Sequence, residues 1–550
     1  MKNVRILALL FSVIISINGF SQNWPWARSG NGGGQNDEYG VATDNAGNIY
    51  ATGLFNGSTI TFGTYTLTNA GGNNIFLVKY DPSGNVLWAK GFGGSVDDRG
   101  YSVATDTYGH IYLTGFFSST LTFGTYTLTN SNNTTPYYDI FLAKLDTSGN
   151  TIWAKSAGGM YQDWSFSVAP DDSGNVFISG AFDSPVLSIG TFTLSNPGYQ
   201  SGFIAKYNKS GTVIWAKSFG GLSYNGYGDA GTCLKTDHTG DVYLTGSFSS
   251  STITFGTYTL TNAGSADIFV VKYDPGGSAV FAISVGGTGN DGGFSIAIDA
   301  ATNMYVTGAF ASSPLVMGTY TLTNAGSDDV FIAKFSPSGN IIWAQSAGGT
   351  GSDHGYCAAT DFSGNIYVTG GFDTTISFGS NHLIATISWL PPLFIVKYNS
   401  NGSVLCATAL ESGGGSYFIG NDGSNGVATD TNGNTYIIGS FKFIIKLILG
   451  SDTLFLSGQQ SVFTAKFTCG AMGVEYFDNP PFQVFPNPSD GNYTLQIDAE
   501  NTPILIYNNM GALIYTSKIH SQKSEINLSS SPPGIYFLLV GNQRLKLIKE

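Results

Sequence analysis

One sequence unit recurs seven times between Trp26 and Thr468, and this repetition constrains the fold more than any single motif does. The best-marked position is the aromatic residue of a Trp-Ala-Lys segment, and successive copies stand 62 to 66 residues apart. The seven copies of this position are Trp26, Trp88, Trp153, Trp215, Phe281, Trp343 and the degenerate Cys406. Such a period is typical of supersecondary units that stack on one another, because so short a unit cannot bury its apolar face alone.

Each unit contains four short segments rich in β-branched and aromatic residues, which predict strands. In the second copy these segments are 101–106, 110–116, 139–145 and the strand that carries Trp153. Apolar residues occupy both faces, as expected for sheets packed between two neighbours. Four antiparallel strands per unit, without helical segments, predict an all-β fold, a seven-bladed β-propeller over residues 22–470.

The two ends of the repeat array predict how the ring closes. The first Trp strand, Asn23 to Gly30, precedes the first complete blade, and the last blade stops after Val462 to Phe467 without a fourth strand. We therefore expect the N-terminal strand to complete the seventh blade and to remove a free sheet edge.

Every unit carries an insert between its second and third strands, built on Gly-x-x-x-Leu, such as Gly63 to Leu67. The alternation around Gly63-Thr64 predicts a two-residue hairpin with glycine first. We expect these hairpins to decorate the rim on which the loops from fourth to first strands also open, so that both sets build one surface.

Two groups of aspartates repeat with the units. The first begins Asp-x-x-Gly-Asn turns, at Asp44, Asp171, Asp361 and Asp430, and we interpret these residues as turn formers. The second group lies in the loops from fourth to first strands, where a carboxylate can satisfy loop N–H groups or join an acidic ring that holds Ca²⁺. Its members are Asp98, Asp163, Asp229, Asp291, Asp353 and Asp422, with Asp37 shifted by one.

Several aromatic residues of units two to four depart from the repeat consensus, and we take them as candidate ligand contacts. Flat aromatic faces beside carboxylates can hold sugar rings, although such residues also pack cores in a chain that is 14% aromatic. Asp163 and Asp229 would then accept hydrogen bonds from the ligand. The candidates are Tyr137, Tyr138, Tyr161, Trp164, Tyr199, Tyr224 and Tyr227.

Residues 1–21 have the pattern of a secretion signal, with Lys2 and Arg5 before an apolar run and small residues before Gln22. No later stretch is long and apolar enough to predict a membrane span. With 23 basic against 36 acidic residues the net charge is −13, which argues against a nucleic-acid partner.

The four cysteines lack metal-ligand spacing. Cys233 and Cys357 occupy one strand position in different blades, so we interpret them as buried small residues that do not pair. Pairing of Cys406 with Cys469 stays open.

The repeat stops after Cys469, and residues 471–550 contain a Phe-Pro-Asn-Pro segment at 485–488, a Pro-Gly-Ile-Tyr segment at 533–536 and a basic end. With these motifs in this order, the segment resembles the type A C-terminal sorting domain of the Bacteroidetes type IX secretion system. This resemblance implies a small β-sandwich that the outer-membrane export machinery recognises and usually removes, leaving the cargo released or attached to the cell surface. Alternating strands and Pro-Gly turns independently favour an Ig-like sandwich. The motif residues are Phe485, Pro486, Asn487, Pro488, Gly491, Gly511, Pro533, Gly534, Ile535, Tyr536, Lys546 and Lys549.

The repeats themselves resemble the bacterial β-propeller repeat family, which implies a fold and leaves activity open. We expect a secreted, monomeric, non-catalytic binding or adhesion protein that takes an extracellular glycan or protein, without a cofactor other than calcium. A polysaccharide-active glycosidase or lyase and a structural surface-layer component are the alternatives. A sialidase would need an arginine cluster, and the propeller region contains only Arg28 and Arg99.

Overall fold

The structure is a computed structural model, and all regular structure that it describes is β-strand. It divides into two compact units, Gln22–Cys469 and a second one that includes Gly470–Glu550. Of the predicted secretion signal only Phe20 and Ser21 are described, at the start of β1 (Phe20–Gly32). The described residues are 20–132, 137–222, 228–385, 391–410, 426–442, 446–471, 482–497, 503–508, 513–518, 523–540 and 543–550.

Six sheets of the first unit contain four strands each, which we number as sheets 1 to 6 in chain order. Sheet 1 contains β2 (Asn36–Thr43), β3 (Ile49–Phe55), β6 (Asn74–Tyr80) and β7 (Val86–Phe92); sheet 2 contains β8 (Asp98–Thr105), β9 (Ile111–Phe117), β12 (Asp139–Leu145) and β13 (Thr151–Ala157); sheet 3 contains β14 (Asp163–Pro170), β15 (Val176–Phe182), β18 (Ser201–Tyr207) and β19 (Val213–Phe219). Sheet 4 contains β20 (Ala230–Thr236), β21 (Val242–Phe248), β24 (Asp267–Tyr273) and β25 (Ala279–Val285); sheet 5 contains β26 (Asp291–Ile298), β27 (Met304–Phe310), β30 (Asp329–Phe335) and β31 (Ile341–Ala347); sheet 6 contains β32 (Asp353–Thr360), β33 (Ile366–Phe372), β36 (Leu393–Tyr398) and β37 (Val404–Leu410).

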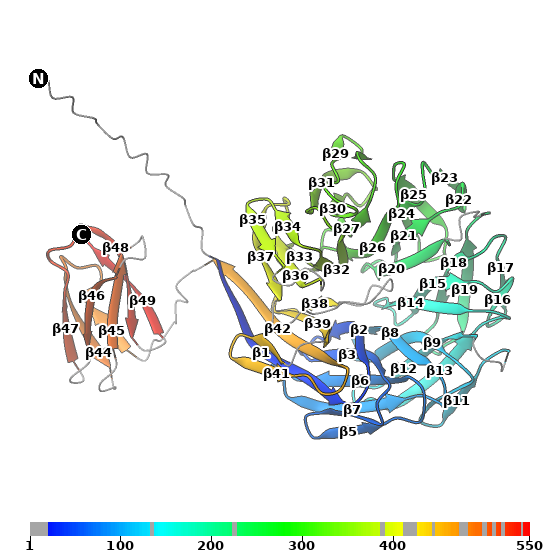
Figure 1. The fold of residues 1–550 in the computed structure, drawn as a ribbon, viewed down its shortest axis with the longest axis horizontal. Coiled ribbons are helices and arrows are strands. Elements are labelled where there is room, and N and C mark those ends of the chain that lie inside the picture. Colours follow the sequence, from blue (N-terminus) through cyan, green and yellow to red (C-terminus); the bar gives the residue numbers. More distant parts are fainter. Residues whose placement is uncertain are drawn as a thin grey trace, which may run out of the picture. The chain divides into compact units, whose positions relative to one another are not determined.

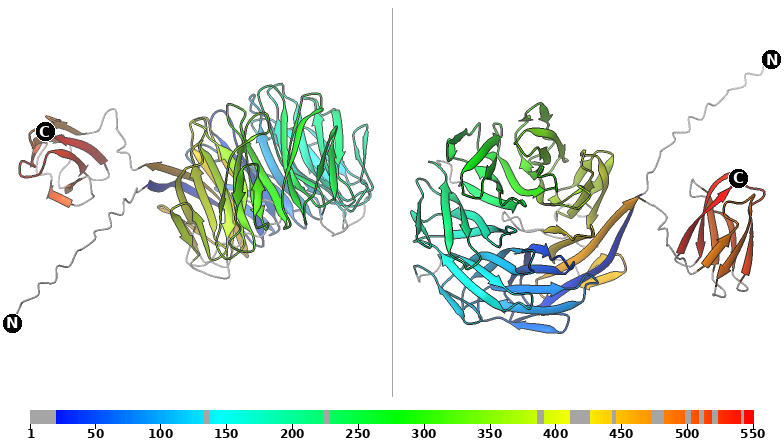
Figure 2. Two further views of the ribbon diagram at one scale, coloured as in Figure 1. Left: turned by 90° about the horizontal axis from the view of Figure 1, so that it is seen from above. Right: turned by 180° about the vertical axis from the view of Figure 1, so that it is seen from behind.

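A further sheet, sheet 7, combines both ends of this unit. Its first four strands are β38 (Val427–Thr429), β39 (Thr435–Lys442), β42 (Gln460–Ala471) and, beside β42, the N-terminal β1. The hairpin of β4 (Thr59–Phe62) and β5 (Tyr65–Thr68) extends this sheet, because β4 pairs with the end of β1. Figures 1 and 2 show β1 in blue alongside β42 in orange. The predicted role of the N-terminal strand as the fourth strand of the last sheet is confirmed by this order.

The sheets surround a common axis, with the first strand of each sheet innermost (Figure 1). Each first strand contacts the first strands of both neighbouring sheets, and β38 contacts β32 and β2, so these contacts run around a closed circle. Threonine hydroxyls also join neighbouring first strands, including the last to the first. Thr105 Oγ1 donates to the carbonyl of Thr43 at 2.7 Å, and Thr43 Oγ1 donates to the carbonyl of Thr429 at 2.8 Å. Second and third strands such as β3 and β6 are buried along their whole length, because a neighbouring sheet covers each face.

The repeated Asp-x-x-Gly-Asn turns form as predicted. Asp44 Oδ1 accepts from the backbone N–H groups of Ala46 and Asn48 at 3.0 and 2.9 Å, and Gly47 has a φ of 77°. Asp44 Oδ2 then accepts from the hydroxyl of Tyr50 at 2.9 Å. These aspartates therefore shape the turn between first and second strands, as the sequence indicated.

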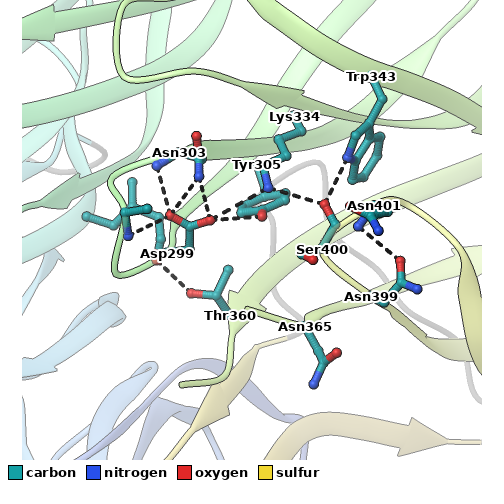
Figure 3. A network of polar contacts seen from close by, with 12 residues as sticks. Asp299, Asn303, Tyr305, Lys334, Trp343, Thr360, Asn365, Asn399, Ser400 and Asn401 are labelled. Carbon is teal, nitrogen blue, oxygen red and sulfur yellow. Dashed lines mark hydrogen bonds and ion pairs between the residues drawn. The ribbon is translucent and has the colours of Figure 1, made fainter. Parts of the chain in front are cut away.

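Neighbouring sheets are joined by a second repeated network, drawn for sheets 5 and 6 in Figure 3. Trp343 Nε1 and Lys334 Nζ both donate to the carbonyl of Ser400, at 3.2 Å each, and Lys334 also lies 3.8 Å from Asp299. The Trp-Ala-Lys position repeats because its indole N–H binds the next sheet's turn between third and fourth strands. The same bond runs from Trp88 to Thr147, from Trp153 to Lys209, from Trp215 to Pro275 and from the N-terminal Trp26 to Pro82.

A disulfide replaces this bond between sheets 6 and 7. Cys406 occupies the tryptophan position, and Cys469 lies two residues beyond Phe467, as Pro82 lies two beyond Tyr80. The chain makes no turn at Cys469, because the fourth strand of sheet 7 comes from the N-terminus. The Cys406–Cys469 pairing that the sequence left open is thus a disulfide.

Cys233 and Cys357 are free, as predicted, but they are half-buried rather than buried. They flank Ser295 of the intervening sheet, whose Oγ lies 3.8 Å from one sulfur and 4.0 Å from the other.

The inserted hairpins all turn at a glycine with φ between 58° and 62°, as a glycine-first turn requires. They lie at the outer circumference (Figure 1), where for example the Tyr65 hydroxyl donates to the carbonyl of Leu87 in the outermost strand at 2.6 Å. Apolar hairpin residues such as Phe123 pack on outermost strands. The hairpins also contact the loops from fourth to first strands, as expected: the N–H groups of Gly158 in such a loop and Ser188 in a hairpin donate to each other's carbonyls at 3.2 and 3.0 Å. The hairpins are β4 (Thr59–Phe62) with β5 (Tyr65–Thr68), β10 (Thr120–Phe123) with β11 (Tyr126–Thr129), β16 (Val186–Ile189) with β17 (Phe192–Ser195), β22 (Thr252–Phe255) with β23 (Tyr258–Thr261), β28 (Leu315–Met317) with β29 (Tyr320–Leu322), β34 (Thr375–Phe378) with β35 (Asn381–Ile384), and β40 (Lys446–Leu449) with β41 (Asp452–Phe455).

The second unit contains two sheets that share one core. One is β43 (Phe482–Phe485), β44 (Asn492–Ile497) and β47 (Lys523–Asn527), and the other is β46 (Leu513–Lys518), β45 (Pro503–Asn508), β48 (Gly534–Val540) and β49 (Gln543–Lys549). Leu495 and Ile526 of the first sheet pack with Ile506 and Leu538 of the second, which makes the unit a small β-sandwich.

Candidate binding site

A β-bulge occurs at one place in every first strand whose pairing is described over that stretch. In sheet 2 the pairing of β8 with β9 shifts between Gly100 and Ser102, which leaves Tyr101 as the extra residue. Because the first strands surround the axis, these extra residues form a belt around it, which we call the axial belt. Its described members are Tyr39, Tyr101, Phe166, Thr232, Phe294 and Tyr356.

On sheets 1 to 3 the axial belt joins further aromatic residues in one cluster, which we call the Arg99 cluster. The Tyr101 ring lies 5.1 Å from that of Tyr39, 5.5 Å from that of Phe116 and 5.9 Å from that of Phe166. Tyr138 continues the cluster, 4.4 Å from Phe116 and 6.5 Å from Trp164. The half-buried members, which border the solvent, are Tyr138, Trp164 and Phe166.

Arg99 supplies the charge in this cluster. Its Nε and Nη2 donate to the two carboxylate oxygens of Asp97 at 3.2 and 3.1 Å, and its guanidinium lies 5.4 Å from the ring centre of Phe116. The Asn73 amide also donates to Asp97. The Arg99 side chain stays 29% exposed, so hydrogen-bond donors and acceptors border an aromatic surface.

The structure brings together some of the predicted aromatic contacts and separates others. Tyr138 and Trp164 belong to the Arg99 cluster, and the ring of Tyr137 lies 5.6 Å from that of Tyr161, which is 40% exposed. Tyr199 is exposed, and none of the described ring contacts joins it to this group. Tyr224 and Tyr227 lie outside the described residues.

The aspartates expected to face a ligand or calcium are buried instead. Asp98, Asp163, Asp229, Asp291 and Asp353 are each 0% exposed. Their second carboxylate oxygen accepts from a loop glycine N–H at 2.7 to 3.0 Å in every case. Asp422 lies outside the described residues.

The roles expected for Asp163 and Asp229 as ligand acceptors are therefore corrected. The loop N–H groups of Gly159 and Gly221 take up these carboxylates, in the backbone-capping role that was the alternative interpretation. Burial raises the pKa of Asp163 to about 8 and those of Asp98 and Asp353 to about 7. Within the described ranges, no three His, Cys, Asp or Glu side chains are grouped so as to hold a metal ion.

Sequence reasoning missed Arg99 and the axial belt as site residues. The available signal was an aromatic residue three positions after the loop aspartate, as in Asp98 to Tyr101 and Asp163 to Phe166. This aromatic position could be interpreted only with knowledge of the bulge. In a strand without the extra residue, regular alternation would not direct this side chain toward the equivalent side chains of the neighbouring sheets.

In the second unit the two ends of the sorting motif meet. Ile548 N donates to Asn487 Oδ1 at 2.8 Å, and the buried Lys549 donates through Nζ to the carbonyls of Leu528 and Ser529 at 3.0 and 2.7 Å. Of the remaining motif residues, Tyr536 is buried, whereas Phe485, Pro486, Asn487, Pro488, Pro533 and Gly534 are exposed. Gly491 is buried and has a φ of 114°. Gly511 and the side chains of Ile535 and Lys546 lie outside the described part.

No helix long and apolar enough for a membrane span occurs in the part of the chain that the structure describes.

Comparison with curated proteins finds distant relatives of the repeats. Over 453 residues the chain is 25% identical to an uncharacterized WD repeat-containing protein of Acanthamoeba polyphaga mimivirus, covering 69% of this chain and 32% of that protein. Over 152 residues it is 23% identical to the regulatory protein FlaEY of Caulobacter vibrioides, covering 27% of this chain and 16% of that protein. The chain thus spans about a third or less of the length of these relatives.

Three solved structures show a loose resemblance. The Dos1 propeller is 9% identical, covers 81% of this chain and 95% of its own, and has a TM-score of 0.39. PorZ, a surface component of the type IX secretion system of Porphyromonas gingivalis, is 12% identical, with coverages of 93% and 81% and a TM-score of 0.20. A gluconolactonase of Xanthomonas campestris is 8% identical, with coverages of 82% and 97% and a TM-score of 0.30. With TM-scores and identities this low, nothing about the activity of this chain follows from these structures.

Comparison with protein families identifies the C-terminal unit. Residues 483–550 match the family described as "Secretion system C-terminal sorting domain", which confirms the predicted sorting domain. The C-terminal residues of this chain therefore form a type IX sorting domain, which directs the protein to the cell surface or the extracellular space.

Proposed function

We propose that this chain is an exported, non-catalytic binding protein in which a closed seven-bladed β-propeller binds an extracellular glycan at the Arg99 cluster. In this proposal sheets 1 to 7 are the blades, and the C-terminal unit is an Ig-like domain that serves export. The closed circle of contacts between first strands supports the ring, and the sorting domain supports the address.

The observation that carries the proposed ligand is the Arg99–Asp97 pair at the edge of an aromatic cluster. Sugar rings carry C–H groups on their faces and hydroxyls on their edges, so they bind where an aromatic face stands next to polar groups. Trp164 and Tyr138 provide half-buried aromatic faces, and the partly exposed Arg99 and Asp97 provide a donor and an acceptor. Because the two charges neutralise each other, this arrangement favours sugar hydroxyls over a strongly charged group.

Glycoside hydrolysis is less well supported by the same residues. It needs two accessible carboxyl groups at a defined separation around the scissile bond. The carboxyls with the highest pKa values, such as Asp163, are fully buried and bound to loop N–H groups. Their recurrence in several sheets also fits a structural role, which is needed at every junction.

The test is a glycan-array screen of the mature full-length protein, with calcium and again with chelator. We expect a defined set of bound glycans in both conditions and at least about tenfold weaker binding in Trp164→Ala, a loss typical of a central aromatic contact. Phe362→Ala is the matched control, because Phe362 is 84% exposed in a turn between first and second strands, at the other end of the sheet. An empty array in both conditions, or equal losses in the two variants, would refute a glycan site at this cluster.

A further inference from the structure

A second group of aromatic and charged residues lies on sheets 5 and 6, which we call the His354 cluster. The rings of Phe294 and Tyr356, both axial-belt residues, are stacked with centres 6.3 Å apart. His354 Nδ1 lies 3.2 Å from the Tyr356 hydroxyl, and its ring stands edge-on to that of Phe294 at 6.0 Å. The imidazole is paired through Nε2 with Asp328 at 3.6 Å, and not with its sequence neighbour Asp353.

The two clusters are built on equivalent positions of two sheet junctions. A parallel bridge joins Asn73 to Asp97 between sheets 1 and 2, and the corresponding bridge joins Asp328 to Ser352 between sheets 5 and 6. The basic residue follows the second bridge residue by two positions in both cases: Arg99 after Asp97, and His354 after Ser352.

The anionic partner differs between these junctions. The carboxylate comes from the second bridge residue, Asp97, at the first junction, and from the opposite residue, Asp328, at the second. The remaining bridge residue donates to the carboxylate in each case, through the Asn73 amide or, at 3.3 Å, the Ser352 hydroxyl. The same chemistry, a basic side chain and a carboxylate beside axial-belt rings, is thus assembled twice from different residues.

The paired basic and acidic side chains of the two clusters reach the solvent to a similar degree. Arg99 and Asp97 are 29% and 19% exposed, and His354 and Asp328 are 32% and 30% exposed. In the part of the belt that the structure describes, sheet 4 interrupts the aromatic residues between the clusters, because it carries Thr232, whose hydroxyl donates to the carbonyl of Gly293 at 2.7 Å. In a closed ring of seven sheets, the two junctions lie four steps apart in one direction and three in the other, close to opposite sides of the axis.

We propose that the two clusters are two subsites for one linear, uncharged oligosaccharide that crosses the axis at this rim. This inference rests on the proposed glycan-binding function and names its substrate class. Each basic side chain is already paired with a carboxylate, so each subsite offers a hydrogen-bond donor and acceptor to hydroxyl groups and no unpaired positive charge to an acidic sugar. A chain that reaches both subsites gains affinity because its second contact becomes intramolecular.

The test is the dependence of affinity on chain length. Isothermal titration of the mature full-length protein would use disaccharides, tetrasaccharides and octasaccharides of β-glucan, xylan and mannan. We expect the bound series to gain at least about tenfold in affinity from disaccharide to octasaccharide. In a variant with both His354 and Phe294 replaced by alanine, most of this gain should be lost, so that octasaccharide and disaccharide bind with similar affinity, whereas Trp164→Ala should weaken binding at every length.

The outcomes separate this inference from the proposed function. If the protein binds glycans with no dependence on length, or if the His354/Phe294 variant keeps the full gain, the second subsite is refuted and the Arg99 site stands. If no oligosaccharide of any length binds, both proposals fail. Thr232→Ala, between the two clusters on the belt, is the matched control and should retain the length dependence.

Discussion

The disulfide between Cys406 and Cys469 offers the sharpest test of how this ring is held together. At the junctions marked by a tryptophan, the indole bonds to the next sheet's turn, and at the junction of sheets 6 and 7 the disulfide occupies the equivalent positions. Changing both residues to serine removes the only covalent link between these sheets besides the chain itself. We expect sheet 7 to become the weakest part of the ring.

The magnitude follows from the length of the closed loop. The two cysteines are 63 residues apart, and the chain-entropy relation for a loop of this size gives a stabilisation of about 4 kcal/mol, near the upper end of the usual range of about 2 to 4 kcal/mol. Noncovalent contacts cannot replace this effect, because it comes from restricting the unfolded chain. Strand β42 would keep its pairing with β39 and β1 in the folded state.

Urea unfolding of the mature protein, followed by tryptophan fluorescence, measures the loss. We expect Cys406→Ser/Cys469→Ser to unfold with a free energy lower by about 2 to 4 kcal/mol, and hydrogen exchange to accelerate most in β38 to β42. Cys233→Ser/Cys357→Ser is the matched control, because these cysteines are free. Equal unfolding free energies for the wild type and the disulfide variant, or four titratable thiols in the unreduced wild type, would refute the reasoning.

Two further predictions concern the ring closure and the buried carboxyls. Gly84 has a φ of 82°, and Gly84→Ala places a Cβ 2.6 Å from the Trp26 indole. This substitution should lower the urea midpoint far more than Gly433→Ala, because Gly433 has a similar φ of 77° but open space around the added Cβ. Equal effects would mean that only backbone strain of about 1 to 2 kcal/mol matters. Burial raises the pKa of Asp163 to about 8, so the folded chain keeps a proton that the unfolded chain releases above about pH 4. The free energy of unfolding should therefore fall as the pH rises from about 4 to about 8. The urea midpoint should fall less over this pH range in Asp163→Asn than in the wild type. In the turn variant Asp81→Asn, the control, it should fall as much as in the wild type. Identical falls in the wild type and Asp163→Asn would contradict this role of Asp163.

Much of the fold could be predicted because its determinants are local and repeated. The aspartate turns, the glycine hairpins and the strand periodicity each depend on residues a few positions apart, and seven copies make such patterns unmistakable. The role of the N-terminal strand followed from counting the predicted strands. The last unit lacks a fourth strand, and the N-terminal strand precedes the first complete unit, so this strand fills the place left in the last sheet. The sorting domain was recognisable for a similar reason: its motifs occur in a fixed order at the chain end.

The candidate site was predicted only in part. Tyr138 and Trp164 stood out because they depart from the repeat, and they do meet. Arg99 was noticed only as one of two arginines, since nothing in its local sequence shows that Asp97 and the ring of Phe116 lie against it. The loop aspartates were expected in the loops, whereas Asp98, Asp163, Asp291 and Asp353 are the first residues of their strands. Whether their side chains face solvent or backbone depends on the path of the preceding loop, which the sequence does not specify.

The amino-acid sequence by itself thus determined the repeat, the strands, the turn chemistry, the closing strand and the export domain, because short-range steric and hydrogen-bonding preferences dictate them. Only the tertiary structure decided which side chains from different sheets meet at the axis, that the hairpins lie at the circumference, and that Cys406 bonds to Cys469. These features depend on a one-residue bulge and on contacts between residues about 60 positions apart, whose geometry exists only once neighbouring sheets have packed.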